Sequence, residues 1–302
     1  MKVNSFARVK FSILTMAVAA VAVCGGTTAT VASADPAGLA AAGTKIELQG
    51  AVNVRDLGGY RTYDGEKIKA GKVIRADALG KLTDADVQKL GTLKVQSVID
   101  FRTPLEVQVL GADRLPSGVS AVSRTIDDTG MFAKMNQAIG SKDPAQQQAL
   151  LGDGKAEQIM ADMYRSFMNA DSLSKFGQTA RDLAETKNAT LFHCTAGKDR
   201  TGWMSYVLLR AVGVPETTAR QDYLLSNQYR AAADKALRDQ LKAGGIMQNP
   251  DLLIPLQEVR DDYLDAAVQA MEDKYGDFGK FLTKGLGLDA GTILKLRKNL
   301  VS

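Results

Sequence analysis

The chain has 302 residues, of which 45% are hydrophobic and 24% are charged, and it contains only 7 prolines. A chain of this length and composition can bury a substantial core, which excludes a disordered or fibrous protein. Its formal net charge of +4 is too small to indicate nucleic-acid binding through overall charge.

The first 34 residues differ from the rest of the chain. Three basic residues precede an apolar stretch from Ile13 to Val23, and small residues follow at 32–34. This pattern is typical of a secretory signal peptide and predicts a secreted protein whose mature chain begins near Asp35. Cleavage would lower the net charge to +1, because segment 1–34 holds three basic and no acidic residues. No later stretch approaches the roughly 20 apolar residues of a transmembrane segment.

The chain contains two cysteines, Cys24 and Cys194. Cys24 ends the apolar run, where a lipid-modified cysteine would lie, but Val23 replaces the small residue expected before it. Diacylglycerol on Cys24 in the mass of the mature chain would overturn secretion as a free protein. Without the signal peptide Cys194 is the sole thiol, so it is inert, paired between chains or kept for its reactivity.

The elements that follow predict an α/β fold. Alternating residues at 45–78 indicate strands and a hairpin, and a capping box at Thr83 opens a helix to about Leu93. A buried strand at 95–99 ends at Asp100, and a second compact strand spans 189–192. The predicted helical segments are 157–185, with a break near Asp171, the apolar helix 202–211, a helix that begins at Glu216, and the mostly helical 251–275 and 290–300. Strands interleaved with helices favour a mainly parallel central sheet flanked by helices, with extra helical elaboration. No linker or repeat divides the chain, so 35–302 is predicted to be a single domain.

Residues 193–202 read His-Cys-Thr-Ala-Gly-Lys-Asp-Arg-Thr-Gly and lie between a predicted strand and a predicted helix. Five residues separate Cys194 from Arg200, which suffices for a tight loop whose N–H groups form an anion cradle with the helix N-terminus. Gly197 permits the backbone geometry, and Arg200 offers a planar fork of donors to two phosphate oxygens. The other positions expected to bind the substrate are Thr195, Ala196, Lys198 and Thr201.

The same surroundings favour the thiolate form of Cys194, which predicts a nucleophile. Thr201 is expected to donate a hydrogen bond to the sulfur and to stabilise it as a leaving group. An exposed thiolate would also be open to oxidation. His193 is the only histidine, which excludes a multi-histidine metal site, and its place on a strand favours a role in orienting the loop. The mechanism requires no metal and no cofactor.

The leaving group needs a proton, and three aspartates are candidates for the acid. They rank as Asp199 inside the loop, Asp100 at the carboxyl end of its strand, and Asp56 in a Gly-Gly turn. Asp56 could equally cap that turn or pair with Arg55.

Three motifs together carry a resemblance: the run 193–202, Asn-Val-Arg-Asp-Leu-Gly-Gly-Tyr at 53–60 and Asp-Phe-Arg-Thr-Pro-Leu-Glu at 100–106. The chain resembles the bacterial cysteine-dependent tyrosine phosphatases, including secreted mycobacterial members. The resemblance implies their fold, Cys194 as nucleophile, Arg200 as phosphate ligand, Asp199 as the acid or its electrostatic partner, and a phosphorylated protein, phospholipid or small phosphoester as substrate. In having a lysine, Lys198, in the loop, the chain also resembles phosphoinositide phosphatases. The lid helices of that family would fall at about 128–170, where no motif supports them.

Other interpretations remain open at this stage. The cysteine loop would also suit a sulfurtransferase, or a catalytically silent module that binds phosphate groups. Lys198 could be a solvated loop charge, and Arg102, Thr103 and Glu106 are expected to cap a helix begun by Pro104 and to brace the site. The helical spacing of Met160, Met163, Tyr164 and Phe167 indicates core positions.

Overall fold

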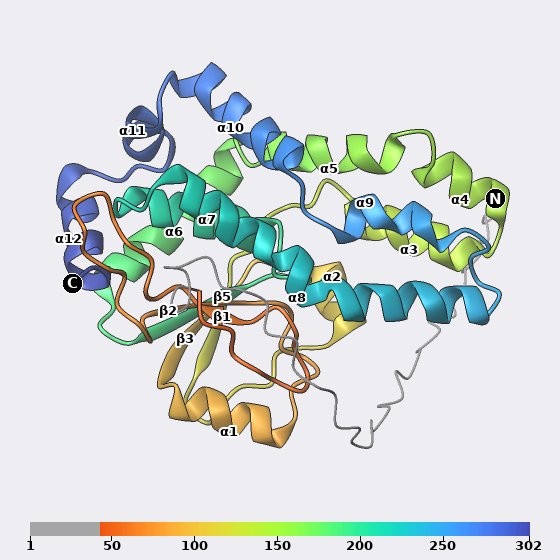
Figure 1. The fold of residues 1–302 in the computed structure, drawn as a ribbon, viewed down its shortest axis with the longest axis horizontal. Coiled ribbons are helices and arrows are strands. Elements are labelled where there is room, and N and C mark those ends of the chain that lie inside the picture. The colour runs from red at the N-terminus through yellow and green to blue at the C-terminus, as the bar shows by residue number, and fades with distance from the viewer. Residues whose placement is uncertain (1–42) are drawn as a thin grey trace, which may run out of the picture. The chain divides into compact units, whose positions relative to one another are not determined.

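The computed structural model describes residues 43–302, so the predicted signal peptide lies outside the described residues. The central sheet has the strand order β1-β2-β5-β3-β4. Its strands are β1 (Arg55–Asp56), β2 (Val73–Ala76), β3 (Val95–Asp100), β4 (Ser120–Ser123) and β5 (Ala189–His193). Strands β2, β5, β3 and β4 run parallel, and only β1 is antiparallel, so the predicted mainly parallel sheet is confirmed (Figure 1).

Helices flank the sheet and extend beyond it (Figure 1). Their bounds are α1 (Asp84–Thr92), α2 (Pro104–Leu110), α3 (Met131–Ser141), α4 (Pro144–Leu151), α5 (Lys155–Ser166), α6 (Ala170–Glu185), α7 (Arg200–Ala211), α8 (Glu216–Ala243), η1 (Pro250–Leu253), α9 (Ile254–Gln257), α10 (Asp261–Tyr275), α11 (Phe278–Lys280), η2 (Phe281–Gly285) and α12 (Ala290–Leu300). Within the described part, no helix is both long and apolar enough to cross a membrane.

The two faces of the sheet bury separate apolar clusters. Because neighbouring side chains of a strand point to opposite faces, Leu191 and Phe192 of β5 enter different clusters. Leu191 packs with the residues around α1, and Phe192 joins the larger cluster around α6 and α7. The helix α8 packs on α7 and also on η1, while α5 packs on α9 and α10. The predicted helical elaboration is therefore present as a layer connected to the sheet through α7 and α8.

Local signals predicted helix starts well. Thr83 accepts a hydrogen bond from the N–H of Asp86, and the Asp86 carboxylate accepts one from the N–H of Thr83, which forms the expected capping box. Thr103 and Glu106 form a second capping box at α2, where Pro104 is the first residue. The predicted break in the helical segment lies at 167–169, and Asn169 caps the second helix.

The first strands are much shorter than the alternating pattern at 45–78 predicts. Arg55 and Asp56 pair with Arg75 and Ile74, and the chain between them forms turns and isolated bridges. The reason is that polar residues of this segment, including Arg55 and Arg75, are fully buried and make contacts with distant parts of the chain. Alternation of polar and apolar residues here does not mark a solvent-facing side of a strand.

Candidate active site

The loop 194–199 leaves the carboxyl end of the central strand β5 and enters α7 at Arg200. Gly197 has a φ of +65°, and a Cβ built there would lie 2.5 Å from the carbonyl oxygen of Ala76 on β2. Any side chain would therefore be both strained and in collision with the neighbouring strand. The loop can take this path only with glycine at 197.

The carbonyl groups of the loop point outward. The Cys194 oxygen lies 3.2 Å from His193 Nδ1, the Thr195 oxygen accepts from the Ala78 N–H at 3.1 Å, the Ala196 oxygen from Asn53 Nδ2 at 2.9 Å, and the Gly197 oxygen from Arg75 at 2.7 Å. In a trans peptide the N–H points opposite to the carbonyl, so the N–H groups of 195–198 turn inward. None of these four donates to an acceptor among the described residues. Four convergent free donors form an anion cradle.

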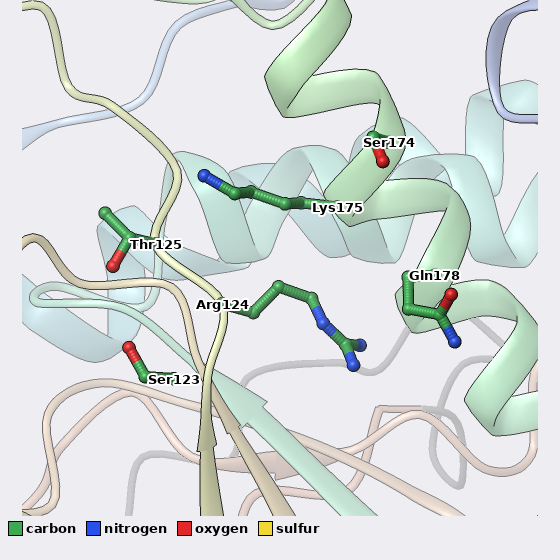
Figure 2. A pocket seen from close by; sticks show the side chains of 6 residues that line it. All are labelled: Ser123, Arg124, Thr125, Ser174, Lys175 and Gln178. Carbon is green, nitrogen blue, oxygen red and sulfur yellow. The ribbon is translucent and has the colours of Figure 1, made fainter.

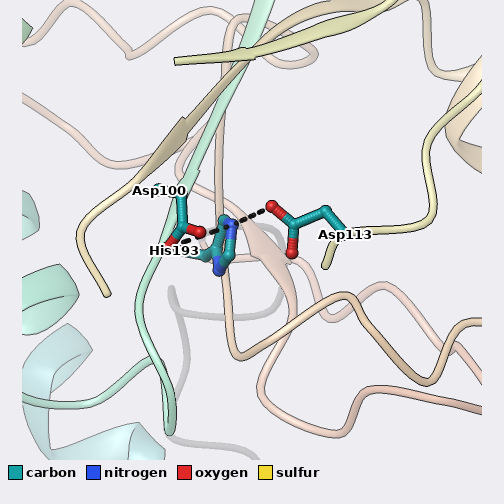
Figure 3. Close-up of side chains that lie close together, drawn as sticks. All are labelled: Asp100, Asp113 and His193. Atoms are coloured by element: carbon teal, nitrogen blue, oxygen red, sulfur yellow. Dashed lines mark hydrogen bonds and ion pairs between the residues drawn. The ribbon is translucent and has the colours of Figure 1, made fainter. Parts of the chain in front are cut away.

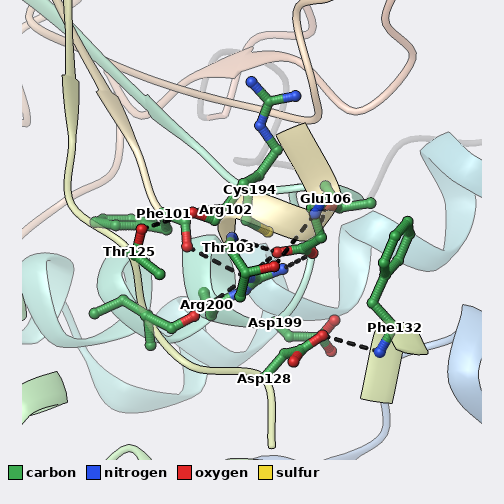
Figure 4. A network of polar contacts seen from close by, with 12 residues as sticks. Phe101, Arg102, Thr103, Glu106, Thr125, Asp128, Phe132, Cys194, Asp199 and Arg200 are labelled. Atoms are coloured by element: carbon green, nitrogen blue, oxygen red, sulfur yellow. Dashed lines mark hydrogen bonds and ion pairs between the residues drawn. The ribbon is translucent and has the colours of Figure 1, made fainter. Parts of the chain in front are cut away.

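Arg200 completes the cradle from the first turn of α7. Its terminal nitrogens bind Glu106 at 2.8 and 2.5 Å, and one of them also reaches the carbonyl oxygens of Phe101 and Ile126 (Figure 4). Its Nε is buried and has no partner among the described residues. The guanidinium is thus fixed from one side and keeps a donor for an anion. Burial alone would lower the pKa of Arg200, but Glu106 and Cys194 raise it above its ordinary value.

Glu106 is fully buried and links three parts of the site. It pairs with Arg200, accepts a 2.6 Å hydrogen bond from the Thr195 hydroxyl and belongs to the capping box of α2. Burial alone would raise its pKa, but the ion pair and the hydrogen bonds outweigh burial and lower the pKa to about 2. Glu106 therefore braces the site, as the sequence predicts.

This ion pair predicts a pH-dependent stability. Because the folded pKa of about 2 lies below the ordinary 4.5, the charged form stabilises the fold above pH 4.5, and this contribution is lost as the pH falls toward 2. Glu106→Gln should lower the free energy of unfolding by on the order of 3 kcal/mol at pH 7. Urea unfolding across the acidic range should show this difference shrinking below pH 4.5. The exposed Glu47→Gln serves as control, and a pH-independent Glu106→Gln difference would contradict the assignment.

Lys198 and Asp199 are both buried inside the loop. Lys198 Nζ donates to Asp199 Oδ1 at 2.9 Å and to the Glu258 carbonyl oxygen at 3.2 Å, so the alternative of a solvated loop charge is wrong. Asp199 Oδ1 also accepts a 2.9 Å hydrogen bond from the Tyr164 hydroxyl, which lies 2.8 Å from that of Tyr223. Asp199 Oδ2 accepts no hydrogen bond from the described residues. Helical spacing predicted Tyr164 as a core residue and gave no sign of its polar end.

The second acid candidate, Asp100, is engaged elsewhere. It forms an ion pair with Arg102 at 2.9 Å, and Arg102 also binds Asp113 at 2.8 Å. His193 Nε2 lies 3.0 Å from Asp113 and 3.7 Å from Asp100, while its Nδ1 faces the Cys194 carbonyl (Figure 3). Asp100, Asp113 and His193 are close enough to share a metal ion, but the Arg102 guanidinium already binds both carboxylates. Asp113 carries no sequence signal of this role, because it lies in a loop 80 residues from His193.

The third acid candidate, Asp56, caps a turn. Its carboxylate accepts hydrogen bonds from the N–H groups of Gly58 at 2.8 Å and Gly71 at 2.5 Å. Burial raises its pKa although both hydrogen bonds act in the opposite direction. Neither Asp56 contact involves the cysteine loop, and Arg55 pairs with Asp222 instead of with Asp56.

The structure differs from two predictions about the Cys194 thiol, its hydrogen bond from Thr201 and its exposure. The Thr201 hydroxyl is buried and has no hydrogen-bond partner in the part of the chain that the structure describes, so it does not donate to the Cys194 sulfur there. Cys194 is also only 1% exposed, because it packs into the larger apolar cluster at the base of the loop. Cys194 therefore lacks the solvent exposure that the sequence analysis predicts.

Asp128 is a carboxylate at the site that the sequence analysis did not identify. It is buried beside Asp199 and Arg200, and it contributes to the raised pKa of Arg200 (Figure 4). Its two oxygens accept from the N–H groups of Gly130 and Phe132, which fixes the start of α3. This contact links the segment 128–141 to the cradle.

A groove of about 440 Å³ lies between the end of β4 and α6 (Figure 2). Its lining consists of Ser123, Arg124, Thr125, Ser174, Lys175 and Gln178. Arg124 pairs with Asp182 and Lys175 with Asp171. None of the lining residues belongs to the cysteine loop.

The fold and the site define an α/β protein with a buried cysteine in an oxyanion cradle formed by backbone N–H groups and an arginine. Comparison with known proteins agrees, since the profile of the "Tyrosine phosphatase family" matches residues 46–302. The chain belongs to this family, and it is a phosphoric monoester hydrolase rather than a sulfurtransferase.

Three similar proteins carry related names. A candidate tyrosine-protein phosphatase of Cupriavidus necator is 29% identical over 80% of this chain and 84% of its own length. The "triple specificity protein phosphatase PtpB" of Mycobacterium tuberculosis is 27% identical over 83% of this chain and 97% of its own length. A solved structure of P. aeruginosa TpbA in complex with phosphotyrosine is 14% identical, covering 76% of this chain and 97% of its own, with a TM-score of 0.29.

Proposed function

We propose that this tyrosine phosphatase works through a cysteinyl-phosphate intermediate at Cys194. The observation that carries the proposal is the cradle of four free N–H groups and the unpaired Arg200 Nε around the cysteine. These donors match the oxygens of a phosphoryl group, and they can follow the charge that develops on them during transfer.

The proposed reaction has two steps. The Cys194 thiolate attacks phosphorus, an S–P bond forms, and the P–O bond to the leaving group breaks while Asp199 gives that oxygen a proton. Water then attacks phosphorus and passes a proton to the Asp199 carboxylate, and the S–P bond breaks to release phosphate and the thiolate. Asp199 is the favoured acid because it lies in the loop and its Oδ2 is not engaged, whereas Asp100 is held by Arg102.

The acid assignment predicts a dependence on the leaving group. Asp199→Ala should lower the rate by about 10²-fold for aryl phosphates with poor leaving groups, and much less for nitrophenyl phosphate, because only a basic leaving oxygen needs the proton. Steady-state kinetics on a series of substituted aryl phosphates measures this dependence. Asp100→Ala is the matched control. If Asp100→Ala shows the dependence and Asp199→Ala does not, the two roles must be exchanged.

The substrate range is proposed to extend beyond phosphotyrosine to phosphoserine, phosphothreonine and phosphoinositides. An ammonium group has three donors, and the two contacts of Lys198 leave the third for a second phosphate. A panel of these substrates, with Cys194→Ser as control, tests the proposal, and turnover of phosphotyrosine alone would restrict the range. Secretion remains a proposal that rests on the pattern of residues 1–34.

A further inference from the structure

One stripe of α8 faces the back of the cysteine loop. Asp222, Ser226 and Arg230 are spaced four residues apart along the helix, so their side chains lie on the same side. Asp222 and Ser226 contact the arginines of β1 and β2, and Arg230 reaches the Ala196 carbonyl oxygen at 3.4 Å. The helical layer is thus in contact with the loop from the side opposite to the cradle.

Asp222 holds two buried arginines at once. Arg55 Nε lies 2.9 Å from its Oδ1 and Arg75 Nη1 lies 2.6 Å from its Oδ2, and all three side chains are at most 1% exposed. The Tyr60 hydroxyl donates a further hydrogen bond at 3.0 Å. Burial alone would raise the pKa of Asp222, but the two guanidinium groups lower it to about 2.

The two arginines connect Asp222 to the loop through separate hydrogen bonds. Arg75 donates directly to the Gly197 carbonyl oxygen at 2.7 Å. Arg55 donates to Asn53 Oδ1 at 2.7 Å, which turns the amide nitrogen of Asn53 toward the Ala196 carbonyl oxygen at 2.9 Å. Both sets of hydrogen bonds start at Asp222, and each contacts the loop only at its final acceptor, a loop carbonyl oxygen.

The peptide groups held in this way are the two that flank Gly197. Glycine has access to most of backbone space, so these are the peptide groups that could most easily rotate and turn an N–H out of the cradle. With both carbonyls bonded on the outer side, the N–H groups of Gly197 and Lys198 face inward. Gly197 is required because no side chain fits there, and its flexible backbone must in turn be held by hydrogen bonds from outside the loop.

We propose that Asp222 is a positioning residue that, through Arg75 and the Arg55–Asn53 pair, keeps the N–H groups of Gly197 and Lys198 directed at the bound oxyanion. The inference rests on the proposed function in that the cradle is taken to bind a phosphoryl group. It adds a role for Asn53 and Arg55 and for α8 that chemistry at the loop alone does not require.

The test measures oxyanion binding separately from turnover. Tungstate affinity by calorimetry, and kcat and KM for nitrophenyl phosphate, are measured on the unmodified chain and on Asp222→Asn, Asn53→Ala and Tyr60→Phe. Asp222→Asn and Asn53→Ala are expected to weaken tungstate binding at least about tenfold and to lower kcat by about 10²-fold, the loss typical of one misdirected oxyanion donor. Tyr60→Phe is the matched control, because it removes a contact of Asp222 that leads to no loop carbonyl, and it should stay within about twofold.

The outcomes separate positioning from mere stability. Asn53→Ala changes no charge and decides the matter if Asp222→Asn does not fold. A folded Asn53→Ala variant with a lower melting temperature but wild-type tungstate affinity and kcat overturns the inference. If the unmodified chain binds tungstate but shows no turnover dependent on Cys194, the proposed function fails while the positioning role is still decided by the binding data.

Discussion

Cys194→Ser is expected to abolish hydrolysis of aryl phosphates, with kcat falling by at least about 10⁴-fold. The loop supplies binding and electrostatic stabilisation, but among the described residues Cys194 is the only thiol, and a serine hydroxyl there has no adjacent base. His193, the one histidine, has its Nδ1 on the Cys194 carbonyl and its Nε2 beside Asp113. Steady-state assay with nitrophenyl phosphate measures the loss.

The control for this prediction is oxyanion binding by the same variant. Because the cradle consists of backbone N–H groups and Arg200, Cys194→Ser should retain tungstate binding within about an order of magnitude. Retained turnover in a Cys194→Ser protein of verified sequence and mass would sink the cysteinyl-phosphate mechanism. Loss of both turnover and binding would instead indicate a collapsed loop.

Arg200→Lys is expected to lower kcat/KM by about 10³-fold, although it preserves the charge. A lysine ammonium cannot reproduce the planar fork that binds Glu106 through two nitrogens and offers Nε to the cradle. It would also leave the Phe101 and Ile126 carbonyl oxygens without their present donor. The variant should therefore lose stability as well as turnover, and thermal unfolding is recorded beside the kinetics.

Arg124→Lys provides a matched control for this exchange. Arg124 is also an arginine with a carboxylate partner, Asp182, but it lines the groove beside α6 and contacts no residue of the loop. We expect its kcat/KM to stay within about twofold of the unmodified chain. An Arg200→Lys variant that is equally active would show that a point charge suffices and that the fork geometry has no role.

Much of the site could be predicted because its signals are contiguous. Cys194, Gly197 and Arg200 lie within seven residues between an apolar strand and an apolar helix, so spacing alone predicts a shared anion site. The capping boxes at Thr83 and Thr103 are equally local, since the partner lies three residues away. Rules of this kind apply to neighbours along the chain, and the structure contains both capping boxes.

The remaining features depend on contacts between distant segments. Asp100 ends its strand at the predicted edge, but Arg102 and its partner Asp113 engage it there. The thiol of Cys194 is buried, because the residues that cover it belong to the core cluster of several helices. The periodicity of the sequence predicts neither the direction of a side chain at the end of a strand nor which residues bury it.

The order of strand, cysteine loop and helix, and the arginine that follows the loop, could be predicted from the sequence itself, because each of these signals depends on residues that are close along the chain. Only the tertiary structure decided how the loop is held. Asp222 and Arg75 are 147 residues apart, and their ion pair forms because the fold brings this residue of α8 next to this residue of β2. Burial makes such a pair persist: a charged group removed from water must find its partner in the fold, and the identity of that partner is set by packing.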